Sequence, residues 1–224
     1  MISRLEYCVL SCAEAFRGDG EIMVSPMGAV PKRAALLARA TFAPDILLTD
    51  GVAGLVCEDG LEGWMPYRRV FETLWAGRRH VMMGASQIDA HGNTNISCVG
   101  DWARPKVQLL GVRGGPGNTI NHTTSYFIPR HSKKAFVERV DMVSGIGADR
   151  AAALGEGGRF FEIRRVVSDL GVFVLREGRL SVRSLHPGVE AAEVVEKTGF
   201  AVSFPETVPV TRDPTAAELA LLRA

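Results

Sequence analysis

The residues best suited to chemistry are gathered in one short segment, residues 84–97, with the sequence GASQIDAHGNTNIS. Three small residues open it, and small residues let a ligand approach the backbone N–H groups closely. A dense set of side chains that can donate or accept hydrogen bonds follows. These are Gln87, Asp89, His91, Asn93 and Asn95. We expect Gln87 and Asn95 either to contact a substrate or to fix the loop backbone, and the sequence leaves both alternatives open.

A second segment, residues 111–118, is rich in glycine and reads GVRGGPGN. It matches neither GxxxxGK[ST] nor GxGxxG, so it is not typical of a nucleotide-binding loop. The Gly114-Gly115 pair could present backbone N–H groups to a carbonyl oxygen, as an oxyanion hole does, or could simply form a tight turn. Asn118 follows directly, either as a site residue or as a structural one.

Acidic and basic side chains add further candidate positions. Asp50 follows the apolar run 46–49, where it could act in a site or form a local Asx turn. Glu58 lies about eight residues beyond the end of that run, and more often such a residue belongs to a solvated loop. Arg130 opens a small basic run, which is typical of a solvated face and could instead hold phosphates.

Elements that could position these residues alternate along the first half of the chain. Short apolar runs at 22–24, 46–49, 80–83 and 107–110 predict buried strands, and periodic segments at 5–17, 30–42 and 67–76 predict helices. In the second half, strands are expected at 160–167, 171–175 and 180–185, with a four-residue hairpin loop at 176–179, and helices at 188–198 and 215–223. This pattern predicts an α/β fold with an open, mostly parallel sheet flanked by helices, plus extra C-terminal strands and helices, in a single domain over 1–224.

Ligands in open α/β sheets bind outside the carboxyl ends of the strands. The turns that follow three of the predicted strands are therefore the first places to look for a site. Those turns follow residues 49, 83 and 110.

Composition excludes several classes of protein. The 224 residues carry 26 Lys and Arg against 25 Asp and Glu, so no bulk charge favours nucleic acid or an anionic membrane as a partner. The N-terminus lacks the order of a signal peptide, and no apolar stretch is long enough to span a membrane. Cys8, Cys12, Cys57 and Cys98 lack paired spacing, so we expect buried free thiols, no metal site and a cytoplasmic protein.

Segments 84–97 and 111–118 together resemble the paired motifs GA-x-Q-[IV]-x-x-x-G-x-x-N and G-x-GG-x-x-[DN] of family I coenzyme A transferases, specifically their beta subunit. APDILLTDG at 43–51 is similar to the family segment that precedes them. The resemblance covers roughly residues 20–150 and implies a CoA thioester substrate and an alpha subunit that supplies half of the site. It implies CoA or substrate contacts from the backbone and side chains of these motifs. The residues concerned are Gly84, Ala85, Ser86, Asn93, Gly114, Gly115, Asn118 and Arg130.

The chain departs from the family at the position of the nucleophilic glutamate, where Asp50 stands. Aspartate is one methylene shorter, and a misplaced reacting atom costs orders of magnitude in rate. Loss of the glutamate is similar to one branch of the superfamily, the ring-cleaving hydrolases of actinobacterial steroid (cholesterol) catabolism, of the IpdAB type. The segment from 111 to 145 fits that branch better than a glutaconate or 3-oxoacid transferase.

The resemblance implies a beta subunit of an α2β2 hydrolase that opens a steroid-derived ring by retro-Claisen cleavage. Its principal base, a glutamate, would come from the alpha subunit, and Asp50, Gln87 and Asn95 are the candidate catalytic residues of this chain. No cofactor is expected beyond the CoA of the substrate. Two alternatives stay open: a true transferase subunit with Asp50 or Glu58 as nucleophile, and a non-catalytic CoA-binding scaffold.

Overall fold

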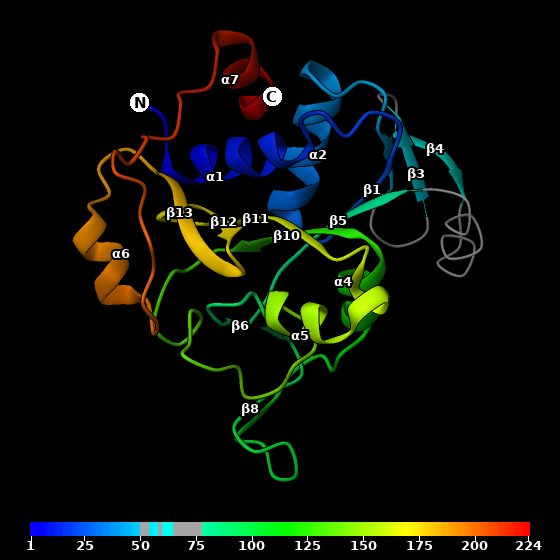
Figure 1. Cartoon of the computed structure of the whole chain (residues 1–224). Coiled ribbons are helices and arrows are strands. Elements are labelled where there is room, and N and C mark those ends of the chain that lie inside the picture. The colour runs from blue at the N-terminus through cyan, green and yellow to red at the C-terminus, as the bar shows by residue number, and fades with distance from the viewer. Residues whose placement is uncertain (50–53, 58–59, 65–77) are drawn as a thin grey trace. The chain divides into compact units, whose positions relative to one another are not determined.

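The computed structural model describes residues 1–49, 54–57, 60–64 and 78–224 (Figure 1). Contacts between Cα atoms divide the chain into two compact units. Unit 1 comprises Met1–Met83 and Arg212–Ala224, and unit 2 comprises Gly84–Thr211. The single domain expected over 1–224 stays a prediction.

The described part of unit 1 includes three parallel strands. β1 (Met23–Pro26) lies between β2 (Leu47–Leu48) and β5 (Arg79–Met83), and both neighbours run parallel to it. Every residue of β1 and β5 is buried, which explains why both segments read as apolar runs in the sequence. The strands predicted at 22–24, 46–49 and 80–83 are confirmed. A separate antiparallel pair is formed by β3 (Gly54–Cys57) and β4 (Gly60–Trp64).

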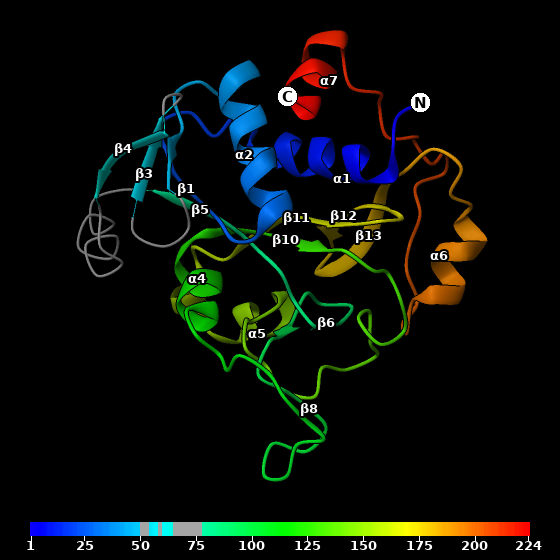
Figure 2. The same cartoon turned by 180° about the vertical axis from the view of Figure 1, so that it is seen from behind.

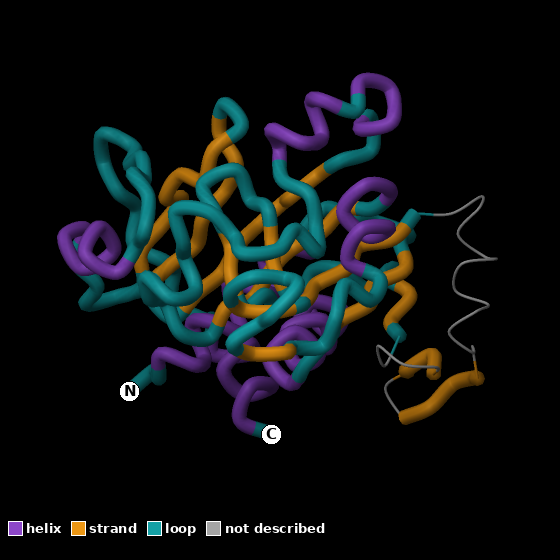
Figure 3. The backbone as a smooth tube through the Cα atoms, turned by 90° about the horizontal axis from the view of Figure 1, so that it is seen from below, coloured by secondary structure: helices purple, strands orange, loops and turns teal. Residues whose placement is uncertain are grey.

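Among the described residues of unit 1, three α-helices occur, and Figures 1 and 2 show them gathered together. They are α1 (Arg4–Ala13), which continues into the short helix η1 (Glu14–Phe16), α2 (Ala29–Thr41) and α7 (Ala216–Arg223). Ser3 and Glu6 form a capping box that starts α1, and Thr215 and Glu218 start α7 in the same way. Because α7 returns to this unit, both termini lie near each other (Figure 3), and Arg223 donates to the Met1 carbonyl oxygen at 3.0 Å.

Unit 2 is built on a mixed sheet. Its strands are β10 (Thr123–Ile128), β11 (Glu162–Ser168), β12 (Gly171–Arg176) and β13 (Arg179–Leu185). β10 and β11 are parallel, whereas β11, β12 and β13 are antiparallel neighbours. Arg176 pairs with Arg179, so the hairpin loop contains only Glu177 and Gly178, and the expected four-residue loop was wrong. Both loop residues have positive φ, which matches the twist of a two-residue hairpin.

The remaining elements of unit 2 are short. Two small antiparallel pairs are β6 (Gln87–Ile88) with β7 (Thr94–Asn95), and β8 (Cys98–Val99) with β9 (Val107–Gln108). The helical segments are α4 (Gly115–Asn121), α5 (Ala148–Ala153), η2 (Gly155–Gly158) and α6 (Ala191–Lys197).

The burial of one predicted strand was wrong. The run at 107–110 was expected to be a buried strand, but β9 belongs to a projecting hairpin and both of its residues are exposed. The prediction rested on the apolar residues of this run alone, and apolar residues occur both in core strands and on exposed surfaces that bind other molecules. The helix predicted at 67–76 lies outside the described residues, and the expected α/β architecture of helices flanking a sheet is confirmed.

Candidate functional site

A buried polar cluster lies beside the carboxyl end of β2 in unit 1. Arg79 donates through Nε to Ser25 Oγ at 2.9 Å, and Thr49 Oγ1 lies 3.4 Å from the same oxygen. All three side chains are buried. Asp50, the residue after Thr49, and Glu58 both lie outside the described residues, so their predicted roles stay predictions. The described part of this edge thus includes a buried guanidinium that donates to the Ser25 hydroxyl group, which Thr49 also contacts.

The loop 84–97 of unit 2 is held by its own side chains. Asp89 Oδ1 accepts hydrogen bonds from the backbone N–H groups of His91 and Asn93, each at 3.0 Å. Asn93 Nδ2 donates to Asp89 Oδ2 and to Asp149 Oδ1, and Asn93 Oδ1 accepts from Gly147 N at 2.8 Å. Burial raises the pKa of Asp89, while these donated hydrogen bonds act in the opposite direction. Both polar atoms of the Asn93 side chain are therefore hydrogen-bonded within the protein.

Gln87 and Asn95 meet across the β6–β7 pair. Asn95 Nδ2 donates to Gln87 Oε1 at 2.7 Å and to the Cys98 carbonyl oxygen at 2.6 Å, and Asn95 Oδ1 accepts from Ser97 N at 2.9 Å. Gln87 Nε2 donates to Asp141 Oδ2 at 3.0 Å, and Gln87 Oε1 also accepts from Asp141 N. We call Gln87, Asn95 and Asp141 the amide network. These bonds fix the loop backbone, which is one of the two roles expected for Gln87 and Asn95. Their catalytic role stays a prediction.

The residues that open the loop differ from the amide network. Gly84 and Ser86 are exposed and Ala85 is half-buried. Ser86 N donates to the Asn95 carbonyl oxygen at 2.9 Å, so the amide network lies directly behind this small-residue stretch. A ligand could therefore approach the backbone of residues 84–86 without displacing the buried side chains.

Within the glycine-rich segment 111–118, packing demands glycine at position 115. A Cβ atom at Gly115 would lie 2.7 Å from the Ser144 carbonyl oxygen, which no side chain tolerates without a backbone shift. The Gly115 N–H donates to the Val112 carbonyl oxygen at 2.9 Å, so in this conformation it is engaged within the turn. Gly114 precedes α4 and is half-buried, and Asn118 is buried on the helix. The oxyanion role of the pair stays a prediction.

The basic run after β10 is split between two environments. Arg130 and the two lysines that follow it, Lys133 and Lys134, are exposed, which suits either a solvated face or contacts to phosphates. His131 between them is buried and stacks on Phe136 with ring centroids 3.6 Å apart. Burial lowers the pKa of His131 to about 3, so the ring is neutral at pH 7. Its ring nitrogens lie 2.9 Å from Ser168 Oγ and 3.0 Å from Thr198 Oγ1.

Several residues of the loop's surroundings were missed by sequence reasoning. Asp141 joins the amide network from 54 positions away, and no local pattern marks it. Gly145 and Gly147 also matter, since a Cβ atom at Gly147 would lie 2.4 Å from the His91 carbonyl oxygen and one at Gly145 would lie 2.6 Å from Thr94 Oγ1. Only the clustering of glycines at 145 and 147 could have hinted at this close approach.

The cysteine side chains that the structure describes carry free thiols. Cys8, Cys12 and Cys98 are free and buried, as expected, and the side chain of Cys57 lies outside the described part. Among the side chains that the structure describes, no group of three or more His, Cys, Asp or Glu is arranged to hold a metal ion. None of the described helices is long and apolar enough to cross a membrane.

Curated relatives match the chain over all or most of its length. The chain is 51% identical over 236 residues to a protein of Mycobacterium tuberculosis named "Cholesterol ring-cleaving hydrolase IpdB subunit", covering 100% of this chain and 94% of that protein. It is 33% identical to one of the subunits of the 3-oxoadipate CoA-transferase of Pseudomonas knackmussii, covering 87% of this chain and 83% of that protein. No family model matches the sequence.

A solved structure gives the same result. The fold superimposes on a chain of the crystal structure of Rhodococcus jostii RHA1 IpdAB with a TM-score of 0.93. Sequence identity is 47%, and the match covers 99% of this chain and 93% of that chain.

Proposed function

The chain belongs to the family of IpdB subunits of cholesterol ring-cleaving hydrolases, and from that premise we propose that it is the beta subunit of a heteromeric hydrolase that opens a steroid-derived ring on a CoA thioester. The observation that carries this proposal is 51% identity over the whole chain to a protein of that name. The partner is an alpha subunit, in an α2β2 assembly. The free thiols of Cys8, Cys12 and Cys98 fit a cytoplasmic location.

The reaction is a hydrolytic retro-Claisen cleavage. A water molecule adds to a ring ketone while a base takes its proton, and the resulting oxyanion collapses to a carboxylic acid as the neighbouring C–C bond breaks. The electron pair of that bond passes into an enolate of the adjacent carbonyl group, which then takes up a proton. The chemistry needs a general base and donors for the two oxyanions, and it requires neither a metal nor a cofactor beyond the CoA of the substrate.

We assign the general base to the alpha subunit and the binding of the CoA thioester to both subunits. From this chain, the backbone of residues 84–86 and Gly114 contact the substrate, with Arg130 near the CoA phosphates. Gln87 and Asn95 act as positioning residues, because their polar atoms are bonded to Asp141, to each other and to loop backbone. Fixing the loop before substrate binds removes a reorganisation cost from the transition state.

The test is to assemble the chain with its alpha subunit and add a cyclic ketone CoA thioester derived from a steroid. We expect a product heavier by one water molecule, with an additional carboxylate and the thioester retained. An unopened ring, with CoA moved to a free acid, would contradict the hydrolase.

A CoA transferase is the second candidate, favoured by 33% identity to the 3-oxoadipate CoA-transferase chain. In a transferase, an acidic residue attacks the thioester, and CoA then becomes attached to the enzyme. The intact mass of this chain after incubation with an acyl-CoA separates the two candidates. An adduct of CoA on Asp50 or Glu58 supports the transferase, and an unchanged mass during turnover supports the hydrolase.

A further inference from the structure

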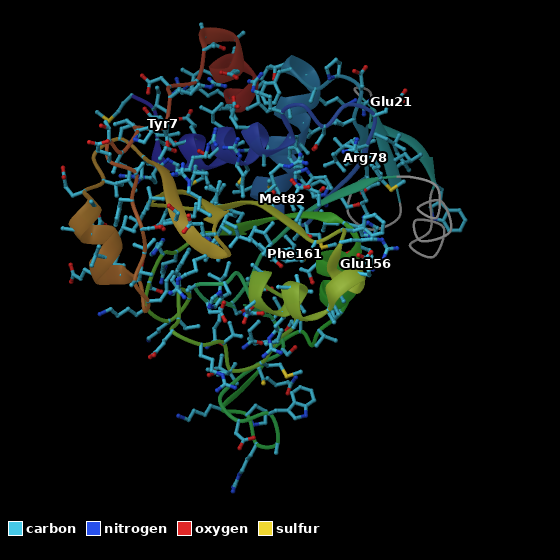
Figure 4. All side chains as sticks on the ribbon, in the orientation of Figure 1. Tyr7, Glu21, Arg78, Met82, Glu156 and Phe161 are labelled. Atoms are coloured by element: carbon cyan, nitrogen blue, oxygen red, sulfur yellow. The ribbon has the colours of Figure 1, made fainter. Side chains whose placement is uncertain are left out.

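The β8–β9 hairpin stands out from unit 2 as a separate projection. We call residues 98–110 the arm; Figures 1 and 2 show it extending away from the rest of unit 2. Cys98 pairs with Gln108, and Val99 pairs with Val107, so the two strands are antiparallel and very short. In Figure 4 the side chains of the outer part of the arm stand free of the unit's other elements. The arm therefore adds little to the core of unit 2.

Large apolar side chains of the arm are left uncovered by the unit, at its outer turn (Trp102), on β9 (Val107) and near its root (Leu110). Trp102 is 59% exposed, Val107 48% and Leu110 70%. A projection on which several large apolar side chains are exposed is typical of an interaction site. Tryptophan in particular is enriched among the residues that carry most of the binding energy of interfaces. A surface of this composition is expected to be covered in the working assembly.

Hydrogen bonds within the arm shape its outer turn. Ala103 N donates to Asp101 Oδ1 at 2.8 Å, and Lys106 N donates to the Val99 carbonyl oxygen at 2.9 Å. Gly100 has φ +89, and a Cβ atom there would lie 3.3 Å from the Lys106 side chain, so a tight turn shapes the tip. A preformed tip loses little conformational entropy when it docks.

The root of the arm is bonded to the amide network of the loop 84–97. Asn95 Nδ2 donates to the Cys98 carbonyl oxygen at 2.6 Å. Gly100 N donates to Asp141 Oδ2 at 2.9 Å, the same carboxylate oxygen that accepts from Gln87 Nε2. A partner that holds the arm therefore acts on the same hydrogen-bonded unit that supports the small-residue stretch 84–86.

The charges and the size of the arm limit what can cover it. Arg104 and Lys106 outnumber Asp101, and neither cation forms a salt bridge with a described residue. In a two-fold contact between arms of two copies, like charges would meet. The apolar side chains offer a few hundred Å², against roughly 800 Å² per partner in a stable interface, so the arm must be part of a larger contact.

We propose that the arm docks on the alpha subunit, with Trp102 in an apolar hollow whose rim carries carboxylates that face Arg104 and Lys106. This inference rests on the proposed function only for the existence of that partner. Binding on the alpha subunit and the shape of the loop 84–97 are then linked through Asp141 and Asn95. The alpha subunit would recognise the arm by its tryptophan and its two cations.

The test measures assembly rather than turnover. Trp102→Ser is compared with Phe160→Ser, a matched control, because Phe160 is an aromatic residue of unit 2 outside the arm with 56% exposure. Each variant is titrated with the alpha subunit, and the complex is followed by light scattering after size exclusion. We expect Trp102→Ser to weaken assembly by about thirtyfold or more and Phe160→Ser to weaken it less than threefold. Equal affinities for Trp102→Ser and the unchanged chain would overturn the proposal.

A second measurement locates the contact and identifies its occupant. Hydrogen exchange of the amides of residues 101–106 is recorded for the free chain at two concentrations and for the complex. The proposal expects protection only in the complex. Protection that rises with the concentration of the free chain assigns the arm to a second copy, and unchanged exchange in the complex leaves the arm uncovered; either result overturns the proposal.

These readouts keep the two proposals distinct. A complex that depends on Trp102 but opens no ring leaves the arm's role intact and removes the proposed activity. A complex that opens the ring and assembles equally well with Trp102→Ser removes the arm's role and leaves the activity intact.

Discussion

The loop 84–97 and the arm are neighbours in the chain with opposite construction. In the loop, polar side chains are turned inward and bonded to one another, as Gln87, Asn93 and Asn95 illustrate. In the arm, apolar side chains such as Trp102 and Leu110 are turned outward. The side chains of the loop bond to one another within this chain, whereas the apolar side chains of the arm are exposed, as the proposed contact with the alpha subunit requires. A subunit that shares its site with a partner needs both: a rigid part that is ready in advance, and an exposed part that finds the partner.

The largest effect on the loop is expected from Gly147→Ala. The added Cβ atom would lie 2.4 Å from the His91 carbonyl oxygen and 2.6 Å from Asn93 N, both of them backbone atoms. We expect a loss of about 3 kcal/mol in the free energy of unfolding, measured by urea denaturation. Gly117→Ala is the control, because open space surrounds that position on α4, and it is expected to be neutral or slightly stabilising. Equal costs for the two variants would show that the loop is less rigid than its contacts indicate.

Asn95→Ala tests the buried amide network. The change leaves the Cys98 carbonyl oxygen and the Ser97 N–H without their bonds to the side chain, in a position with no exposure. The expected loss is about 2–3 kcal/mol in the free energy of unfolding, measured by the same denaturation. Asn121→Ala removes one exposed bond, to the Gly117 carbonyl oxygen, and is expected to cost under about 0.5 kcal/mol. A small loss for Asn95→Ala would favour a role for Asn95 in contacting substrate.

The buried ring of His131 makes the stability of the folded chain depend on pH. Its pKa is about 3 in the folded chain against an ordinary 6.5, so between these values the unfolded chain binds more protons and stability falls as the pH falls. At pH 5 the loss relative to pH 7 is roughly 2 kcal/mol. Denaturation of His131→Gln at the two pH values is expected to show a smaller difference. An unchanged pH dependence in the variant would exclude His131 as its source.

The smallest effect is expected from Leu110→Ser in the isolated chain. Leu110 is exposed in the arm, so its removal takes no apolar surface out of the core. We expect a change of less than about 0.5 kcal/mol in the free energy of unfolding, measured by urea denaturation. A large loss would mean that the arm supports its own unit, and the contrast with the loop would then disappear.

Much of the fold could be predicted because buried strands and amphipathic helices leave local patterns. β1, β5 and α2 occur close to where apolar runs and helical periodicity put them. The run at 107–110 failed because the same apolar residues serve an exposed arm, and only tertiary structure distinguishes the two. The strand β10 (Thr123–Ile128) was not anticipated, since its first three residues are hydroxyl-bearing and it follows a helix without a clear turn signal.

The site was predictable in its segments but not in its contacts. The loop 84–97 was singled out by its dense polar residues, yet the partners that hold Gln87 and Asn93 are Asp141 and Asp149, more than fifty positions away. Sequence spacing carries no information on such pairs, because they come together only when the chain folds. For the same reason the close approach of Gly115 to the Ser144 carbonyl oxygen could not be predicted, and its contact with a ligand stays a prediction.

The most direct test of the central claim is the fate of oxygen from water. The complex of this chain with its alpha subunit is given a ring-ketone CoA thioester in oxygen-labelled water, and the product is analysed by mass spectrometry. Hydrolytic cleavage predicts one labelled oxygen in the new carboxylate, an opened ring and a CoA thioester that is retained. An intact ring, or a label found only in a carboxylate released from CoA, would contradict the assignment of this chain to a ring-cleaving hydrolase.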